Sequence, residues 1–446
     1  MAQSNSPDGV EAGRRGLLSL APLAFFLLAY LGGSALVGDF YKIPMTVAFI
    51  ASSCLAVAVS SGSLTKRIER FSVGAGHRNI LLMVWVYVLA GAFAFTAKEI
   101  GAVDATVGLI LRVLPSSMVY VALFISAAFV SLAIGTSVGT VVALVPIAAG
   151  MAAQLGQSAA ELAALVVGGA YFGDNLSFIS DTTIAATQTQ GVRMDDKFKM
   201  NIRIVWPALL IMLVYSILMG VGSDVEPFDE PVRFAYVLPY AVVVGLAIWG
   251  VNVMVVLLVG IVTAGLVGIV GGQIDFWGLL SDMGQGVTSM GDLIVVAMLA
   301  GGMLELIRAN GGLRLIMNLM QKGIRGRRGA QLSVAAIVAL ANVCTANNTV
   351  AIITVSGIAR DISTRFGIDP RRTASILDTV SCCVQGLLPY GVQMLLAANL
   401  AGCTPLDILP HLYYPVLTGL CVVVSIITDR KRRRPVPNPE TKTGEA

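Results

Sequence analysis

The chain has 446 residues, of which 56% are hydrophobic and 13% charged, and its formal net charge is +4. A soluble domain averages about 25% charged residues, so the composition excludes a soluble multi-domain enzyme of this length. The chain has two histidines, and its six cysteines form no CxxC pattern, which argues against a His- or Cys-based metal site. The small positive charge reflects loops between apolar segments and indicates no nucleic-acid partner.

Apolar stretches of membrane-spanning length recur along the chain. Residues 1–16 form a polar N-terminal tail, and the apolar stretch that follows has no A-x-A-like cleavage site, so we expect a retained first helix. The expected spans are 17–36, 43–62, 80–97, 117–155, 161–191, 200–222, 233–250, 252–270, 292–309, 330–361, 372–402 and 405–427.

Four of these stretches are too long for one plain helix. The stretches 117–155 and 330–361 break at "IGTSVGT" and "CTANNTV", and we interpret both as re-entrant hairpins. The stretches 161–191 and 372–402 break at "FGDNLSFISD" and "QGLLPYG", and we expect each to cross once as a helix unwound in the middle. Non-helical backbone survives at membrane depth only inside protein or beside a wet cavity.

The positive-inside rule tests this topology. With both termini in the cytoplasm and 100–114 lying along the interface, most of the 30 basic residues fall on the cytoplasmic side, Lys197 and Lys199 among them. External segments hold Lys42, Lys98, Arg112 and Arg233. The pattern predicts a multi-pass protein of the cell inner membrane with a basic cytoplasmic tail at 428–446.

The two halves of the chain align at an offset of about 210 residues. "LAGAFAFTAKEIGA" at 89–102 aligns with "LAGGMLELIRANGG" at 299–312, and the breaks fall in register. We therefore predict an all-α polytopic membrane protein of two inverted repeats, 17–199 and 233–402, each with a hairpin and a broken helix. Residues 200–222 would link the repeats, and 405–427 would be the last helix. Inverted repeats with paired broken helices are typical of alternating-access transporters, whose site lies between the repeats.

The stretch "GGAYFGDNLSFISDTT" places two carboxylates inside an apolar span. An intramembrane carboxylate costs about 2.5–3.5 kcal/mol to insert, and such residues usually mark ion or proton pathways. Oxygen ligands suit a small cation such as Na+ or Li+, for which a proton can compete at the same carboxylate. The candidate cation ligands here are Asp174, Asn175, Ser177, Ser180, Asp181 and Thr182, and Asp174 and Asp181 are also candidate proton carriers. Both aspartates could instead be helix caps at the break.

The other breaks supply further candidates. The hairpin tips add Thr136, Ser137, Asn347, Asn348 and Thr349 as cation ligands, although Asn and Thr also cap their own backbone. Asp378 is a third candidate for proton coupling, or else a partner for an intramembrane cation, and Gln385, Tyr390 and Gln393 are expected to line a substrate cavity. We see no obvious buried Arg or Lys in this core, which favours a cation as cargo over an organic anion, although the N-termini of the broken helices could take the place of a basic side chain.

At "GAYFGDNLSFISDTT" the sequence resembles the NhaC-type Na+/H+ antiporters, whose signature reads roughly GAYFGDKxSPLSDTT. The matching positions are Gly169 to Asp174, Ser177, and Ser180 to Thr183. The resemblance implies the ion-transporter-superfamily fold and either Na+/H+ exchange or Na+-linked exchange of small organic anions or amino acids. Asn175 stands where the family often has Lys, Phe178 where it has Pro, and Ile184 where it often has Asn. Losing that lysine changes the local charge by one.

The sequence is therefore compatible with two functions. The first is a Na+(Li+)/H+ antiporter, with Na+ as the transported ion and no cofactor. The second is a Na+- or H+-coupled exchanger or symporter of a small organic acid or amino acid. The sequence holds no HExxH, no GxSxG and no credible Ser–His pair, so we predict that it is not an enzyme. Besides the lipid bilayer, a homodimer partner is plausible by family analogy.

Overall fold

The computed structural model describes residues 7–32, 44–178, 180–221, 233–315 and 324–429. Within these ranges the secondary structure is helical, without strands. Among the described residues, seven helices are long and apolar enough to cross a membrane, or up to nine if two bent helix pairs are each one span. The prediction of an all-α polytopic membrane protein is therefore confirmed.

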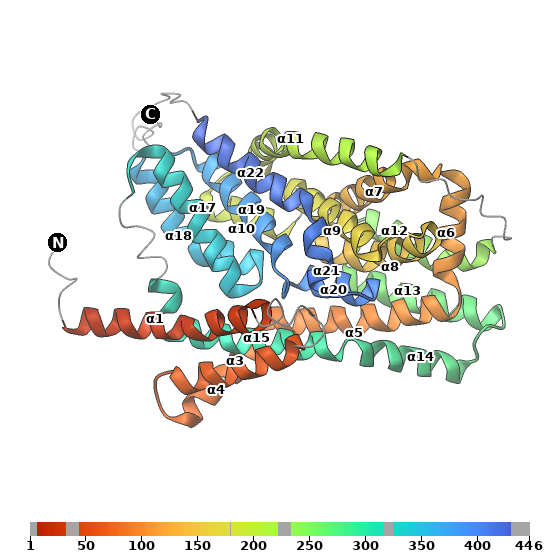
Figure 1. The fold of residues 1–446 in the computed structure, drawn as a ribbon, viewed down its shortest axis with the longest axis horizontal. Coiled ribbons are helices and arrows are strands. Elements are labelled where there is room, and N and C mark those ends of the chain that lie inside the picture. Colours follow the sequence, from red (N-terminus) through yellow and green to blue (C-terminus); the bar gives the residue numbers. More distant parts are fainter. Residues whose placement is uncertain (1–6, 33–43, 179, 222–232, 316–323, 430–446) are drawn as a thin grey trace, which may run out of the picture.

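The helices form two layers (Figure 1). The first layer contains α1 (Pro7–Leu27, extended to Gly32 by a π-helical turn), α3 (Met45–Val59), α4 (Leu64–Ala75), α5 (Arg78–Glu99), α12 (Phe234–Ile248), α13 (Val253–Val270), α14 (Phe276–Ser289) and α15 (Gly291–Ala309). The second layer contains α7 (Val119–Ile134), α8 (Ser137–Leu155), α9 (Ala159–Leu176), α10 (Asp181–Gln190), α11 (Met194–Gly220), α17 (Gly326–Thr345), α18 (Asn348–Arg365), α19 (Pro370–Leu387), α20 (Val392–Ala401), α21 (Pro405–Ile408) and α22 (Tyr413–Ile427). Helix α6 (Ala102–Val113) leads from the first layer to the second.

The second layer repeats one four-helix pattern. Helices α7 to α10 and α17 to α20 follow at the offset expected from the sequence. Helices α9 and α19 have 18 residues each, and α10 and α20 have 10 each. The pairs α7–α8 and α17–α18 are the two expected hairpins, and α9–α10 and α19–α20 are the two broken helices. The second helix of each break packs across the repeats, since α10 contacts α18 and α20 contacts α8.

In the first layer, too, helices from one half of the chain pack on helices from the other half. Helix α4 packs on α15 and α14 packs on α5, while α3 packs on α15 and α13 on α5. Two glycine pairs make the closest crossings, Gly74 with Gly301 and Gly91 with Gly286. A Cβ on any of the four would overlap a facing backbone, so the absence of side chains allows these helices to meet. Each layer is thus built from both halves of the chain.

The sequence reading missed two helices and placed the start of a third too late. Helix α4 falls in what reads as a basic loop, and α14 fills a polar, glycine-containing stretch before α15. Helix α11 begins at Met194, earlier than the expected linker at 200–222. The stretch 100–114, expected along the interface, contains α6. Residues 7–16 of the predicted N-terminal tail are helical and form the start of α1, so that helix begins earlier than expected. The predicted C-terminal tail lies outside the described residues beyond Asp429, and the exact repeat boundaries stay predictions.

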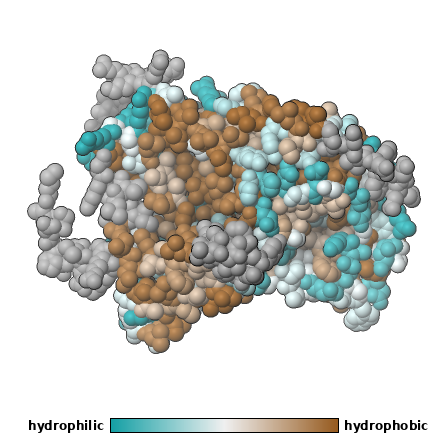
Figure 2. All heavy atoms as spheres, in the orientation of Figure 1, coloured by the Kyte–Doolittle hydropathy of each residue, from teal (hydrophilic) through white to brown (hydrophobic). Residues whose placement is uncertain are grey.

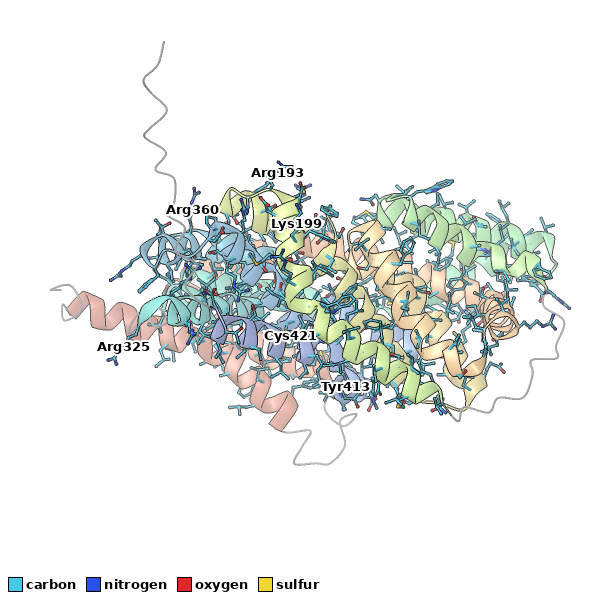
Figure 3. The ribbon with its side chains drawn as sticks, turned by 90° about the horizontal axis from the view of Figure 1, so that it is seen from above. Arg193, Lys199, Arg325, Arg360, Tyr413 and Cys421 are labelled. Atoms are coloured by element: carbon cyan, nitrogen blue, oxygen red, sulfur yellow. The ribbon has the colours of Figure 1, made fainter. Side chains whose placement is uncertain are left out.

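Basic residues mark one end of the molecule. Arg325 and Arg360 lie at the left of Figure 3, toward the end where α1 begins, and Arg193 and Lys199 lie nearer the middle. In Figure 1, α22 ends at this same side. Figure 2 shows a broad apolar surface over the left and upper parts of this face, with polar residues gathered toward the right and at the upper left. Lipid-facing apolar surface of this extent is expected of a membrane protein.

Candidate functional site

The tips of the two hairpins are tight turns at matching positions. Between α7 and α8, Gly135 adopts a left-handed conformation with φ 73°, and between α17 and α18 the matching Ala346 has φ 47°. Ala346 is the only non-glycine residue with positive φ in the described chain. Its carbonyl oxygen accepts a hydrogen bond from Gln385 Nε2 at 2.9 Å, which helps to hold this strained turn. Asn347 then caps α18, because its Oδ1 accepts from the Val350 amide at 2.9 Å.

Both hairpin tips and both helix breaks meet at one cavity of about 540 Å³. The second layer contributes the starts of α8, α10, α18 and α20, and the first layer contributes the first half of α5 and the loop that leads into α13. Most of the residues singled out from the sequence line it: Thr136, Ser137, Asp174, Ser180, Asp181, Thr182, Asn347, Asn348, Thr349, Gln385 and Gln393. The sequence reading did not include Asn79 on α5 or Asn252 before α13, which also line the wall.

Asp174 is the most tightly held carboxylate at the cavity. Its side chain is near the end of α9, and the residue is 5% exposed. Oδ2 accepts a hydrogen bond from Ser137 Oγ at 2.7 Å, and Oδ1 accepts one from Ser180 Oγ at 2.5 Å. The Ser180 hydroxyl also lies 2.7 Å from Thr182 Oγ1. One carboxylate and three hydroxyls therefore form a compact set of hard oxygen atoms, the type of donor that Na+ and Li+ prefer.

The second repeat adds amides to this wall. Gln393 Nε2 donates to Ser137 Oγ at 2.9 Å, so a chain of hydrogen bonds runs from repeat two to Asp174. Gln385 Nε2 donates to Gln393 Oε1 at 3.3 Å, while Gln385 Oε1 is buried and has no hydrogen-bond partner. A buried acceptor without a partner is uncommon, and it is open to a donor or a cation in the cavity.

Asp181 differs from Asp174 in its surroundings. It is the first residue of α10, it is exposed, and it lies at the cavity wall. The N-cap position of α10 is Ser180, without a side-chain cap hydrogen bond, so the interpretation of Asp181 as a helix cap is wrong. A carboxylate in the first turn still suits the helix dipole, which is compatible with a cargo role.

Two predicted residues, Asn175 and Asp378, lie together away from the cavity, around a lysine that the sequence reading assigned to a cytoplasmic loop. Lys197 Nζ lies 2.5 Å from Asp378 Oδ2, with side chains that are 1% and 0% exposed. It also donates to the Asn175 carbonyl at 2.5 Å and to Thr183 Oγ1 at 2.6 Å. The expectation that the core holds no buried Lys or Arg is therefore wrong. Asn175 and Asp378 face this ammonium group and do not line the cavity.

Two more predicted residues have other partners. Ser177 Oγ donates to the Leu132 carbonyl at 3.0 Å, which ties the break to hairpin one. Tyr390 donates its hydroxyl to the Val343 carbonyl at 2.7 Å and packs with Phe26 and Phe49. Neither lines the cavity, so the structure does not support Ser177 as a cation ligand or Tyr390 as part of the cavity wall. Among the described residues, no group of three or more His, Cys, Asp or Glu side chains could hold a metal ion.

The sequence also matches a family model and several known proteins. The model of the Na+/H+ antiporter family matches residues 20–222 and 231–428. The chain is 24% identical over 423 residues to the Na(+)/H(+) antiporter NhaC of Bacillus subtilis, covering 86% of this chain and 91% of that protein. It is 23% identical over 426 residues to the malate-2H(+)/Na(+)-lactate antiporter of the same organism, covering 86% and 89%.

A third relative is the arginine/ornithine antiporter ArcD of Halobacterium salinarum, 25% identical over 356 residues, with 71% of this chain and 73% of that protein covered. All three relatives are antiporters by name, although their cargoes differ. Since the family model covers nearly the whole chain, this protein is a secondary antiporter that belongs to the NhaC-type Na+/H+ antiporter family.

Proposed function

We propose that this protein exchanges Na+ or Li+ for H+ across the cell inner membrane, with Asp174 and Asp181 as the groups that bind cation and proton in turn. The observation that carries the proposal is the charge of the cavity wall. Among the described residues that line the cavity, the charged side chains are these two carboxylates, and none is basic. A wall that is negative and rich in oxygen atoms favours a small cation over an anion.

The buried lysine does not reverse this argument. Lys197 points to Asp378 and to the Asn175 carbonyl, behind the break, and it is outside the cavity lining. Its charge is balanced locally by Asp378, so the two carboxylates at the wall remain without a basic partner. We infer that Asp174, held by the hydroxyls of Ser137 and Ser180, is the main cation ligand. In the proton-loaded state the same carboxylate would carry H+.

The predicted topology indicates to which side of the membrane the cavity opens. In the proposed orientation the first half of α5 and the loop before α13 lie in the cytoplasmic half of the membrane, and both line the cavity. We infer that this conformation is open to the cytoplasm, with both termini on that side. The position of Arg325 and Arg360 toward the end where α1 begins supports this orientation (Figure 3). Alternating access would then expose the same residues to the other side.

A second candidate cargo is a small organic acid or amino acid exchanged with Na+ or H+. The observation in its favour is the size of the cavity, since about 540 Å³ is typical of small-molecule sites and far exceeds one dehydrated cation. The starts of α8, α10 and α20 also face it without side-chain caps. Helix N-termini bind carboxylate groups. Two relatives, named for malate and lactate and for arginine and ornithine, carry such solutes.

Proteoliposomes loaded with a pH-sensitive dye separate the two functions. Purified protein is challenged in turn with Na+, Li+, K+, L-lactate, L-malate and L-arginine at a fixed internal pH. The proposal expects Na+ and Li+ to change internal pH in the absence of any organic solute, and K+ to have no effect. A pH change that requires an organic solute would instead favour the second candidate and contradict simple cation/proton exchange.

A further inference from the structure

The ammonium group of Lys197 joins three helices at the first break. Lys197 lies in the first turn of α11, and its partners are the Asn175 carbonyl at the end of α9, Thr183 in α10 and Asp378 in α19. Asn201, one turn later on α11, donates to the Asn175 carbonyl at 3.2 Å and to Asp378 Oδ2 at 2.9 Å. We call Lys197, Asn201, Asn175 and Asp378 the Lys197 clamp.

The clamp satisfies backbone groups that the break leaves free. A helix that ends inside a protein has carbonyls without intrahelical partners, and these are costly to bury unpaired. Lys197 and Asn201 donate to the Asn175 carbonyl, and Thr183 Oγ1 donates to the Ser177 carbonyl at 2.8 Å. A cation at the carboxyl end of a helix also interacts favourably with the helix dipole.

The clamp also joins the two repeats, and it exists on one side only. Asp378 belongs to α19 of repeat two, and its Oδ2 accepts hydrogen bonds from Asn175 and Asn201 of the first half. At the offset that relates α10 to α20, the residues that match Lys197 and Asn201 are Ile408 and Leu412, which are apolar. The break next to the cargo carboxylate Asp174 is therefore fixed by charge, whereas the break of repeat two has neutral contacts such as Gln385 with Ala346.

We propose that Lys197 is a positioning residue of the transport site: paired with Asp378, it fixes the end of α9 and so holds the adjacent Asp174 in the geometry that binds the cargo. The inference rests on the proposed function for the identity of the cargo. It does not require Lys197 or Asp378 to contact the cargo, and both are outside the cavity lining.

The test compares Lys197→Met, Asp378→Asn and the double variant Lys197→Met/Asp378→Asn. Lys199→Met is the matched control, because this lysine is exposed on the same helix. Each single variant leaves one buried charge without its partner, and we expect a lower unfolding temperature in detergent for both. The double variant removes both charges and should recover part of that loss, while the control should match the wild type.

Transport kinetics then separate positioning from a purely structural role. We expect the double variant to raise the KM for Na+ by about 10- to 100-fold, the usual effect of losing a residue that orients a ligand-binding group, while kcat changes much less. A folded double variant with the wild-type KM would overturn the proposal, and so would single variants whose losses of stability simply add.

The response of the wild-type protein to cations tests the proposed function separately from the role of Lys197. A wild-type protein that responds to neither Na+ nor Li+ would contradict the proposed function alone. The same KM comparison would then use whichever of L-lactate, L-malate or L-arginine changes internal pH in the wild type. The unfolding temperatures decide whether the Lys197 clamp couples the two residues in either case.

Discussion

The hydrogen bond from Ser137 to Asp174 gives the most quantitative test of the site. Ser137 Oγ donates to Asp174 Oδ2 at 2.7 Å and accepts from Gln393 Nε2 at 2.9 Å, so it joins the two repeats at the carboxylate. Ser137→Ala removes one of the two hydroxyls that hold Asp174. It leaves the cavity and the helix N-terminus in place.

The expected size follows from the type of bond. A hydrogen bond to a charged group contributes about 1.5–3 kcal/mol. Because about 1.4 kcal/mol corresponds to a factor of ten, the loss weakens cation binding by about 10- to 150-fold if the bond acts on the cation-loaded state alone. Gln393 loses its acceptor as well, but it lines the cavity, where water can replace the serine oxygen.

Cation-evoked pH changes in proteoliposomes measure this effect as the Na+ concentration that gives half of the maximal rate. Ser131→Ala is the matched control, since Ser131 is equally buried on the same hairpin but donates to the Ala170 carbonyl at 2.6 Å. We expect the control to lower stability with little change in Na+ affinity. Equal Na+ affinities for the two variants would refute the assignment of Asp174 as the main ligand.

Two further predictions concern the fold. Gly91→Val should prevent the close crossing of α5 and α14 and reduce the yield of folded protein. Gly284→Val should leave the yield unchanged, because a Cβ there meets nothing within 4 Å. Equal yields of the two variants in fluorescence-detected gel filtration would count against the crossing. Asp429→Ala removes the carboxylate that accepts hydrogen bonds from Arg327 and Gln331, and should lower the unfolding temperature through a loss of about 1–3 kcal/mol. Asp195→Ala, which breaks an exposed ion pair, should leave it unchanged, and an equal effect of both would contradict the role of Asp429.

Much of the fold was predictable because breaks in apolar stretches are local signals. Gly135 and the polar residues at each interruption mark the points where a helix cannot continue, and the offset between halves follows from those points. Helices α4 and α14 were missed because charged or small polar residues interrupt their apolar pattern. Their stability comes from packing on α15 and α5, which no single segment reveals.

The site was predictable as far as the cavity wall, and the Lys197 clamp was not. Lys197 is flanked by Asp195, Asp196 and Lys199, a pattern typical of an exposed loop. Its burial depends on Asp378 in the other half of the chain, and such a pairing leaves no mark in local sequence. Two signals were available: Asp378 was a candidate partner for an intramembrane cation, and Asn175 stands where the family resemblance expects a lysine. The structure brings a lysine from α11 to the carbonyl of that same residue.

The central claim is that Asp174 binds the transported cation in competition with protons. Equilibrium binding of radioactive Na+ to the purified protein, measured from acidic to alkaline pH, tests it most directly. We expect saturable binding that protons displace in the wild type, and no such binding in Asp174→Asn. Asp292→Asn, in the first turn of α15 and outside the cavity lining, should bind Na+ as the wild type does. Proton-sensitive Na+ binding that survives in folded Asp174→Asn would contradict the claim.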